Sequence, residues 1–541
     1  MPPFFSSLFS RTKHSNSGKK MARKRDGLLG WIISLAILGL LALLAAMQVD
    51  AGYPKLFAGI DDFRYSKASN QKPDHRQRLL HGLANLKASL DVATPPSSPQ
   101  VEQGMRGGSR VYHAVDYGAD PTGKNDSTSA LLRAIDDAFK SPGDRTLMPG
   151  IADLGGAELH LDGGSYLISS PIKLPASKGG NFKIHSGSLL ASDDFPTERF
   201  LIELWASPSS EAEVEAEAEK DVDASMAASN TDYDYEYITI RDLLLKANFR
   251  CGGIAVVNSL RTTINNCYIT HFKTTGIWVR GGHETYISDS YLGQHITAGN
   301  HPDEKNFSGT GIKLMGNDNA VTDVVIFSAE TGVLVTGQAN ILTGVHCYNK
   351  ATGWGGTGIY LKLPGLTQTR IVNCYLDFNS IVSEDPMQLT VSNCYFLGGG
   401  NIVLKSVNGK MSGVNIVDNM FSGGGNGVDI VRLDESNGAF TKIEQVVVHR
   451  NNVDGMRLRT TVAKASVQGN GSVWTVDFSP VLLFRDRIEH VQYTLRTGSA
   501  FPNHALRNVS ENKVVIESDI AVSASVDVSV DQSVGSSISI N

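Results

Sequence analysis

Cysteine is scarce in this 541-residue chain: there are five, an odd number, and no two of them form a CxxC pair. This spacing excludes a disulfide framework and a CxxC metal site, and we expect the thiols to be buried as small apolar groups. The chain also has no excess of positive charge: it contains 49 Lys and Arg and 55 Asp and Glu residues, for a net charge of −6. A nucleic-acid partner is therefore not expected. No group of residues has metal-ligand spacing, so we expect neither a metal nor a cofactor.

A long apolar run occurs near the N-terminus. Residues 28–47 carry no charge and follow five Lys and Arg residues between Lys19 and Arg25. The run has about the 20-residue length that spans a bilayer, and small residues around Ala51 also fit a signal cleavage site. Residues 1–51 are thus predicted to be a basic cytoplasmic tail plus a signal peptide or a signal anchor. The remainder would be secreted to the cell wall or exterior, or held as a type II membrane protein through residues 28–47.

Four glycosylation sequons lie in this remainder and agree with secretion. They begin at Asn125, Asn306, Asn470 and Asn508.

Glycine, by contrast, is abundant at 54 residues, and the short apolar runs between glycines predict many strands and turns. Residues 52–109 have the composition of a spacer. Residues 110–455 are predicted to form the main body, interrupted at 207–236 by a disordered acidic insertion. Residues 456–541 are predicted to be a small β-rich C-terminal domain. Its alternating runs at 472–478 and 513–517 favour antiparallel strands.

The main body repeats the phrase Gly-apolar-x-apolar. The glycines are Gly253, Gly276, Gly311, Gly332 and Gly358, at intervals of 23, 35, 21 and 26 residues. A period near 22 with occasional insertions indicates stacked coils, each too small to bury a core by itself. The sequence therefore predicts an all-β fold, a right-handed parallel β-helix, whose neighbouring strands lie about 4.8 Å apart.

A second phrase falls between these strands. It occurs as Asn266-Cys267-Tyr268, Asp289-Ser290-Tyr291, His346-Cys347-Tyr348, Asn373-Cys374-Tyr375 and Asn393-Cys394-Tyr395. Inward positions of stacked coils form columns of like residues, so four of the five cysteines are explained as core. The same alignment places His346 in the polar column of Asn266, Asp289, Asn373 and Asn393.

One amphipathic helix is predicted at the start of the body. The run Ala130-Leu131-Leu132-Arg133-Ala134-Ile135 has the pattern of a short amphipathic helix, and Asp126 or Ser127 is placed to cap its N-terminus. The open end of a β-helix exposes its core, so a helix here is expected to act as a cap.

Two segments resemble a known family. Val115-Asp116-Tyr117-Gly118-Ala119-Asp120, with Asp126-Ser127-Thr128 after it, resembles the entry motif of the pectate-lyase-like β-helix superfamily. Residues 316–323, 344–353 and 358–368 resemble the plant QUARTET3-type polygalacturonases. The resemblance implies a glycoside hydrolase that cleaves α-1,4-galacturonan (pectin) in the cell wall, with a pectic polysaccharide as its partner. The Asn-Thr-Asp, Asp-Asp, Gly-His-Gly and Arg-Ile-Lys motifs of ordinary polygalacturonases do not occur here in that form.

Candidate catalytic residues follow from register. Inverting glycosidases hold two carboxyl groups about 6.5–9.5 Å apart, one as acid and one as base. Glu330 and Asp377 precede Gly-apolar-x-apolar strands two coils apart, a separation of about 10 Å. Asp318 and Asp323 form a rival pair, although turn chemistry alone favours Asp at position 318. His346 is a further candidate, because the family uses a histidine on the coil after its acids.

Candidate substrate-binding residues are cations and rings near these positions. Lys350, Arg370 and Lys405 are suited to uronate carboxylates, and Lys405 resembles the end of the Arg-Ile-Lys motif. His295 lies in a long-loop segment, and Trp354 precedes a strand. Two alternatives stay open at this point: a pectin or uronan lyase that abstracts the C5 proton, and a non-catalytic β-helix that binds polysaccharide.

Overall fold

The computed structural model describes residues 110–140, 145–206, 233–295, 307–348, 355–365, 367–425, 427–498 and 500–533. The predicted segments 1–51 and 52–109, with the apolar run 28–47, lie outside these ranges, as do residues 207–232. Within the described ranges no helix has the length and apolar character needed to cross a bilayer. Tyr235 and Glu236 already belong to a strand and are buried, so the predicted insertion ends before residue 236.

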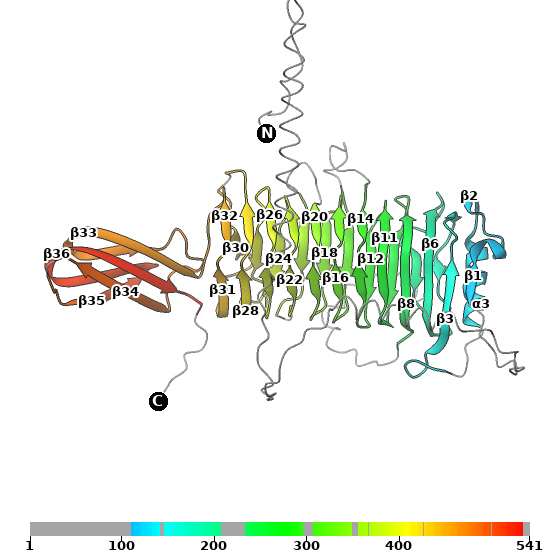
Figure 1. Ribbon diagram of the computed structural model, residues 1–541, viewed down its shortest axis with the longest axis horizontal. Coiled ribbons are helices and arrows are strands. Elements are labelled where there is room, and N and C mark those ends of the chain that lie inside the picture. The colour runs from blue at the N-terminus through cyan, green and yellow to red at the C-terminus, as the bar shows by residue number, and fades with distance from the viewer. Residues whose placement is uncertain are drawn as a thin grey trace, which may run out of the picture. The chain divides into compact units, whose positions relative to one another are not determined.

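Successive coils of the main body stack in parallel as a right-handed β-helix (Figure 1). Each coil crosses a 22-stranded sheet with a bend in it, here called sheet A, and then a 10-stranded sheet, sheet B. The bend divides sheet A into a first arm and a second arm. A full coil thus runs from the first arm through the bend to the second arm, then to sheet B, and back to the first arm.

The strands of the first arm are β1 (Val111–His113), β3 (Ala152–His160), β10 (Ser259–Leu260), β13 (Tyr286–Ser288), β16 (Ala320–Thr322), β19 (Ile341–Thr343), β22 (Arg370–Val372), β25 (Thr390–Ser392), β28 (Lys410–Val417) and β31 (Lys442–His449). Those of the second arm are β2 (Thr122–Asp126), β4 (Ser165–Ile168), β14 (Tyr291–Gly293), β17 (Val325–Phe327), β20 (His346–Tyr348), β23 (Tyr375–Asp377), β26 (Tyr395–Leu397), β29 (Met420–Ser422) and β32 (Asn452–Asp454). Three strands continue through the bend: β6 (Gly179–Ala191), β8 (Tyr235–Lys246) and β11 (Thr263–Thr270).

Sheet B consists of β5 (Ile172–Lys173), β7 (Phe200–Leu204), β9 (Gly252–Val257), β12 (Thr275–Arg280), β15 (Thr310–Leu314), β18 (Thr331–Val335), β21 (Thr357–Leu361), β24 (Ile381–Glu384), β27 (Ile402–Lys405) and β30 (Val431–Asp434).

The Gly-apolar-x-apolar phrases form the strands of sheet B. Their first apolar residue points inward and pairs with its counterpart on the next coil, in a column of β-branched residues with at most 1% of each exposed. The column includes Ile254, Ile277, Ile312, Val333, Ile359, Ile381, Ile402 and Val431. Branched side chains fit a pleated surface and fill the interior coil after coil, which is why a 22-residue repeat produces one continuous core.

A residue in the left-handed region makes the bend in sheet A. The position is held by Asp242, Asn266, Asp289, Asp323, Gly344, Asn373, Asn393, Asp418 and Arg450, with φ between 49° and 65°. Asn and Asp tolerate this conformation better than most residues, and glycine has no Cβ to oppose it. Just after the bend, inward polar groups form a ladder: the Cys394 amide donates to Asn419 Oδ1 and the Asn419 amide donates to Asn451 Oδ1, both at 3.0 Å. All five cysteines are free and buried.

The alignment of His346 with the bend column was wrong. His346 pairs with Val325 on one side and Tyr375 on the other, and Cys347 pairs with Leu376 rather than with another cysteine. The bend residue of this coil is Gly344, two residues earlier. His346 therefore occupies the outward column of tyrosines on the second arm.

The predicted cap is helix α3 (Thr128–Phe139), preceded by the short 3-10 helix η1 (Ala114–Tyr117). Leu131, Ala134 and Ile135 are fully buried and belong to the same core as the coils. The Asp126 carboxylate accepts the Thr128 amide at 3.0 Å, whereas Ser127, the N-cap residue, makes no capping bond with its side chain. In Figure 1, α3 lies at the end of the stack formed by the first strands.

The C-terminal sheet, sheet C, is antiparallel and has its own core. It contains β33 (Val462–Asp477), β34 (His490–Thr497), β35 (His504–Ser510) and β36 (Lys513–Asp531). The three other strands all pair with β36. Val473 pairs with Glu517, which joins the two runs predicted to be antiparallel.

Candidate functional site

The candidate site lies where the second arm of sheet A turns into sheet B, here called the A–B corner. Thr275, Thr310, Thr331 and Thr357 pair in sequence at the start of four sheet B strands and mark this corner in each coil. Glu330 directly precedes Thr331, and Asp377 ends β23, four residues before Ile381, where β24 begins. Since β18, β21 and β24 are consecutive in sheet B, the two acids lie two coils apart, a rise of about 10 Å. By strand register Asp377 is level with Phe327 and Tyr348, so Glu330 stands three residues further along its own coil.

Asp377 has the environment of a general acid. Its side chain is partly buried on the outer face of β23, and burial raises the pKa of its carboxyl group. Among the described residues its carboxylate has no hydrogen-bond or ion-pair partner that would offset this burial. A carboxyl group that keeps its proton in mildly acidic solution can protonate a leaving oxygen.

Glu330 differs from Asp377 in exposure. Its side chain is open to solvent, and its backbone carbonyl accepts the Thr357 amide of the next coil at 2.8 Å. This hydrogen bond fixes the backbone of the corner. The site thus offers one partly buried and one exposed acidic residue, two different environments of the kind that an acid and a base require.

A continuous series of rings, here called the aromatic track, lies on the outer face of the second arm beside these acids. Its members are Tyr268, Phe327, Tyr348, His346, Tyr375 and Tyr395, with successive ring centroids 6.3, 5.7, 5.0, 4.2 and 6.3 Å apart. Asp377 follows Tyr375 by two residues on β23 and so points to the same outer side. The stacked pairs cover one another's faces, so the track presents ring edges along its length and an exposed ring, Tyr395, at its end. An exposed aromatic face is a surface suited to a pyranose ring.

His346 is held in this track as a neutral ring. Burial lowers the pKa of its imidazole to about 4, and its Nε2 is buried without a hydrogen-bond partner among the described residues. Because Nε2 is buried, it is not open to a ligand on the outer face. His346 therefore serves the track through its ring contacts with Tyr348 and Tyr375.

His295 lies on the same corner, at the end nearer to the N-terminus. It lines a small cavity of about 390 Å³ together with Phe249, Lys273, Gln294 and Ser308. The His295 ring stacks on Phe307 at 4.5 Å, and Lys273 approaches Glu198 at 3.5 Å. Lys273 and Ser308 stand two residues before β12 and β15, and Glu330 stands one residue before β18, so the cavity lies on the same edge of the β-helix.

Lys405 is placed elsewhere, on the outer face of sheet B. Its ammonium contacts Glu384 Oε1 at 2.9 Å, and Tyr360 donates to the same oxygen at 2.6 Å. Glu384 is nearly buried and pairs in register with Lys405. The charge of Lys405 is thus compensated inside the protein.

The remaining predicted residues are not gathered at the A–B corner. Arg370 begins β22 on the first arm, where its side chain is exposed. Asp318 lies in the turn before β16 and contacts His283 Nδ1 at 3.0 Å, whereas Asp323 is the bend residue after β16. The two rival acids therefore flank one strand of the first arm and serve its turns. Lys350 and Trp354 lie outside the described residues.

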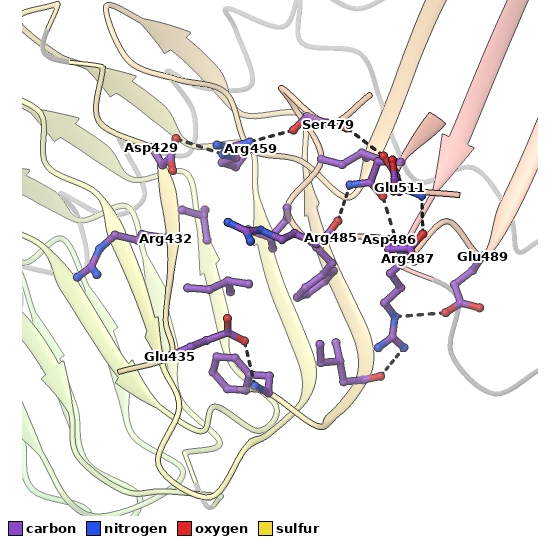
Figure 2. A pocket seen from close by; sticks show the side chains of 18 residues that line it. Asp429, Arg432, Glu435, Arg459, Ser479, Arg485, Asp486, Arg487, Glu489 and Glu511 are labelled. Atoms are coloured by element: carbon purple, nitrogen blue, oxygen red, sulfur yellow. Dashed lines mark hydrogen bonds and ion pairs between the residues drawn. The ribbon is translucent and has the colours of Figure 1, made fainter. Parts of the chain in front are cut away.

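A larger cavity of about 1090 Å³ lies between the last coils and sheet C (Figure 2). Four arginines and five carboxylate residues line it, so their charges nearly cancel. Several of them pair with one another, as Arg459 does with Asp429 at 3.1 Å and Arg487 with Glu489 at 3.2 Å. A site for a uronate chain needs uncompensated cations, and this cavity offers few.

Sequence reasoning missed both the aromatic track and a cluster of histidines near the N-terminus. His113, His160 and His185 occupy matching positions on β1, β3 and β6, each facing outward on the first arm. In the sequence they are 47 and 25 residues apart, so no local spacing connects them. The sequence nevertheless contains a sign of this cluster. Each histidine ends an alternating apolar–polar run, and successive coils place the ends of such runs side by side.

No protein-family model matches the chain. Over 467 residues the chain is 57% identical to polygalacturonase QRT3 of Arabidopsis thaliana, which covers 84% of this chain and 92% of that protein. Among solved structures, ORF18 of Geobacillus virus E2 gives a TM-score of 0.48 at 9% identity, over 87% of this chain and 84% of that one. The A-module of the Azotobacter vinelandii mannuronan C-5 epimerase AlgE6 gives 0.44 at 12% identity, over 64% and 96%.

Proposed function

Because the chain belongs to the family of polygalacturonase QRT3, we propose that it is a glycoside hydrolase that cleaves α-1,4-galacturonan, the backbone of pectin. The observation that carries this proposal is the 57% identity over 92% of that relative. Identity on this scale extends through the whole β-helix rather than through a single motif. The A–B corner supports the proposal, since it combines two carboxyl groups with a row of aromatic rings.

In the proposed mechanism Asp377 is the general acid and Glu330 the general base. Asp377 protonates the glycosidic oxygen as the bond to the anomeric carbon breaks, and charge develops on the sugar ring. Glu330 removes a proton from the water that attacks the opposite face, which inverts the anomeric configuration. The separation of about 10 Å between their strands leaves room for that water, and the side chains shorten the gap.

The galacturonan chain is proposed to lie along the A–B corner, across successive coils. The exposed ring of Tyr395, at the end of the aromatic track, would pack against a sugar face. His295, which lines the cavity beside Lys273, would contact the polymer further along the chain. Lys350 and Trp354 belong to the segment between β20 and β21 and are proposed to bind substrate as well.

The protein is further proposed to act outside the cytosol, in the cell wall. The support is the charge-free run 28–47 behind a basic flank, together with the four sequons. Of the sequon asparagines, Asn125, Asn470 and Asn508 are exposed in the structure and open to a glycan, and Asn306 lies outside the described residues. Cleaved signal and membrane anchor are distinguished by the N-terminal sequence of the mature protein.

Incubation of the full chain, made in a secreting host cell, with polygalacturonate tests the proposed activity. We expect new reducing ends without ultraviolet absorbance, and a product whose anomeric configuration is inverted in the first NMR spectra. Unsaturated ends absorbing in the ultraviolet would identify a lyase and overturn the proposal. An intact polymer that the protein nevertheless binds would leave a polysaccharide-binding β-helix in its place.

A further inference from the structure

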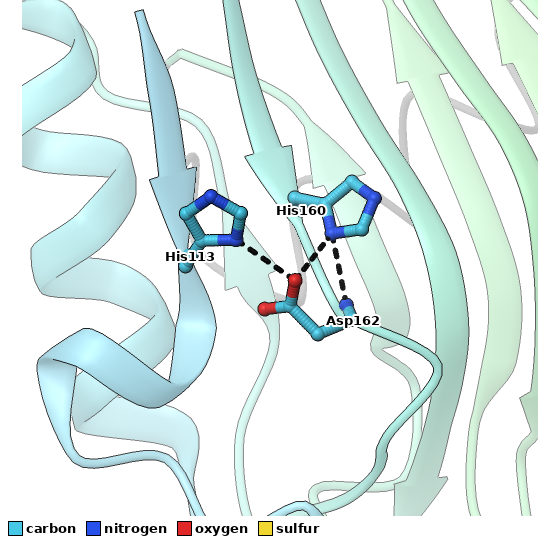
Figure 3. Close-up of side chains that lie close together, drawn as sticks. All are labelled: His113, His160 and Asp162. Carbon is cyan, nitrogen blue, oxygen red and sulfur yellow. Dashed lines mark hydrogen bonds and ion pairs between the residues drawn. The ribbon is translucent and has the colours of Figure 1, made fainter.

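Two histidines and one aspartate meet at the N-terminal end of the first arm. His113 and His160 are paired in register on β1 and β3, and Asp162 follows in the turn after β3 with a φ of 49°. The left-handed turn brings the Asp162 carboxylate back between the two imidazoles (Figure 3). Asp162 Oδ1 lies 2.8 Å from His113 Nδ1 and 2.7 Å from His160 Nδ1.

Both imidazoles share one carboxylate oxygen. Asp162 Oδ1 lies at hydrogen-bond distance from His113 Nδ1 and from His160 Nδ1. The backbone amide of Asp162 also approaches His160 Nδ1, at 3.1 Å. Two imidazole nitrogens and one carboxylate oxygen, all of them atom types that bind metal ions, are therefore gathered in one place.

The spacing suits a single ion. The three potential ligand atoms, one from each side chain, lie within 4.8 Å of one another. Two ligands of a tetrahedral Zn²⁺ ion, each about 2.0–2.1 Å from the metal, are about 3.3 Å apart, so small side-chain movements suffice to admit it. The side chains of His113, His160 and Asp162 are 43%, 30% and 28% exposed, which leaves solvent on one side to supply the remaining ligand.

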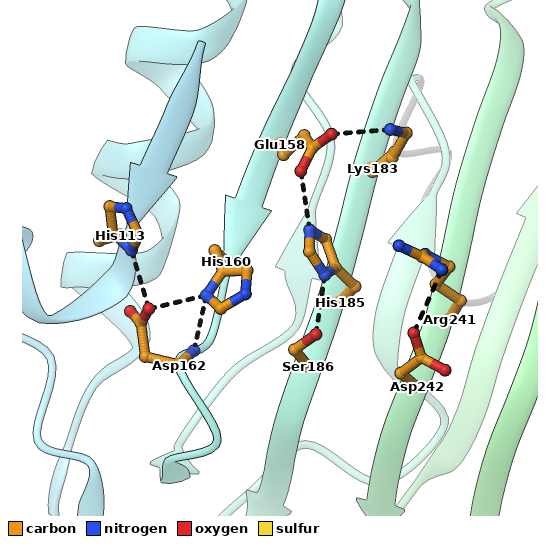
Figure 4. A network of polar contacts seen from close by, with 9 residues as sticks. All are labelled: His113, Glu158, His160, Asp162, Lys183, His185, Ser186, Arg241 and Asp242. Atoms are coloured by element: carbon orange, nitrogen blue, oxygen red, sulfur yellow. Dashed lines mark hydrogen bonds and ion pairs between the residues drawn. The ribbon is translucent and has the colours of Figure 1, made fainter. Parts of the chain in front are cut away.

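Neighbouring charges do not oppose such an ion. Lys183 and His185 both contact Glu158, at 2.7 and 3.0 Å, so the nearest ammonium is paired with a carboxylate (Figure 4). The His185 ring meets the His160 ring edge-on at 4.7 Å and orients it. This second layer holds the imidazole in place, as outer partners do around metal-binding histidines.

We propose that His113, His160 and Asp162 bind one divalent transition-metal ion of the Zn²⁺ class. Two imidazoles and one carboxylate favour such an ion over Ca²⁺ or Mg²⁺, which prefer oxygen ligands. The site belongs to β1, β3 and the turn after β3, far along the stack from Glu330 and on the other arm. Its role is structural: the ion ties the first strand to the following coil at the end capped by α3.

Equilibrium dialysis of the full chain against Zn²⁺ at pH 7, with metal analysis and thermal unfolding, tests this site. We expect one tightly held Zn²⁺ per chain and a higher Tm, whereas Ca²⁺ at the same concentration leaves the Tm unchanged. His160→Gln and Asp162→Asn should each weaken Zn²⁺ binding at least tenfold and remove the rise in Tm. His449→Gln is the matched control, because His449 ends β31 on the same outward column of the first arm.

Either of two results overturns the proposal. One is a wild-type chain that retains no Zn²⁺. The other is His160→Gln binding Zn²⁺ as tightly as the wild type, which would place the ion elsewhere. Far-ultraviolet circular dichroism of both ligand variants checks that they are folded, and these partly exposed positions tolerate polar substitutions. None of these readouts uses cleavage of polysaccharide, so they stand apart from the proposed hydrolase activity.

Discussion

The imidazole of His346 stacks on the ring of Tyr375 in the next coil, with centroids 4.2 Å apart and planes inclined by 20°. The contact joins two coils on their outer face, where most side chains of a β-helix meet water. It also places a ring nitrogen, His346 Nε2, beside the strand that carries Asp377. The stacked rings and the proposed general acid therefore lie on the same two neighbouring strands, β20 and β23.

Asp377→Asn should abolish most hydrolysis, because an amide cannot donate the proton that the leaving oxygen needs. General acid–base groups contribute about 10²–10⁴-fold, and we expect kcat on polygalacturonate to fall by this factor. The matched control is Asp323→Asn: the bend column holds asparagine at Asn373 and Asn393, so this change preserves both fold and activity. Loss of activity in Asp323→Asn with retention in Asp377→Asn would reverse the assignment.

Glu330→Gln should lower kcat by a similar factor, with little change in KM or Tm, because Glu330 is exposed and its backbone bond to Thr357 remains. Initial-rate measurements over a range of polygalacturonate concentrations separate the two constants. A variant with unchanged kcat would exclude Glu330 as the base.

The pH profile reports the state of Asp377. The acid must be protonated, so kcat/KM should fall as the pH rises through its pKa, which burial raises above the ordinary range of an aspartate. We expect the alkaline limb of the profile to lie above the usual range of an exposed aspartate. An alkaline limb within that usual range would show that another carboxyl group is the acid.

His346→Phe should make the protein more resistant to acid. The folded-state pKa of about 4 lies below the usual value near 6.5, so the unfolded chain takes up a proton first as the pH falls. The stability contributed by neutral His346 is complete above about pH 6.5 and declines by roughly 2–3 kcal/mol toward pH 4. Phenylalanine keeps the stack on Tyr375 and does not titrate.

Urea unfolding at pH 7 and pH 4.5 measures this effect as a difference between wild type and variant. The loss of stability on acidification should be smaller in His346→Phe. His449→Gln, on the first arm, should follow the wild type. Equal losses in all three proteins would refute the buried, neutral state of His346.

Asn419→Leu should destabilise the β-helix strongly. Asn419 is fully buried; it accepts the Cys394 amide and donates to Val391 O and Asn451 Oδ1, each at 3.0 Å. Leucine removes the partner of the Cys394 amide and of the Val391 carbonyl, at about 1–3 kcal/mol each, whereas Asn451 Oδ1 keeps the Asn419 backbone amide. Chemical denaturation should show a loss of at least about 2 kcal/mol. The exposed Asn437→Leu serves as control and should change stability by less than about 0.5 kcal/mol.

The repeat that builds sheet B could be predicted because its physical cause is local. A glycine, an inward Ile or Val and a second inward aliphatic residue recur in the five phrases, and each set, such as Gly276 with Ile277 and Val279, is buried in the same way. The cap helix was predictable for the same reason, since its amphipathic pattern and its capping aspartate are contiguous in the chain.

The register of one strand of the second arm, β20, was predicted wrongly, and the cause is again local. His346-Cys347-Tyr348 has the letters of the Asn-Cys-Tyr phrase, but the chain bends at Gly344 rather than at His346. The left-handed residue sets the register, and residue types two positions later do not. A search for the bend residue in each coil would have placed His346 among the tyrosines.

Contacts between coils were beyond local patterns altogether. The aromatic track and the cluster of His113, His160 and Asp162 assemble residues from separate turns of the repeat. Corner loops differ in length from coil to coil, so the sequence distance between such neighbours varies. Only the exact pairing of strands identifies them.

Helix α3 affects how this protein unfolds. Because a coil pairs only with the coils before and after it, the molecule behaves as a one-dimensional chain of coupled units, and its free energy is a sum over units and interfaces. In such a system an interior unit must break two interfaces to open, whereas a terminal unit breaks one, so unravelling begins at the ends. Leu131 and Ile135 anchor α3 in the core. They therefore slow unfolding from this end and prolong the folded lifetime of every coil that follows α3.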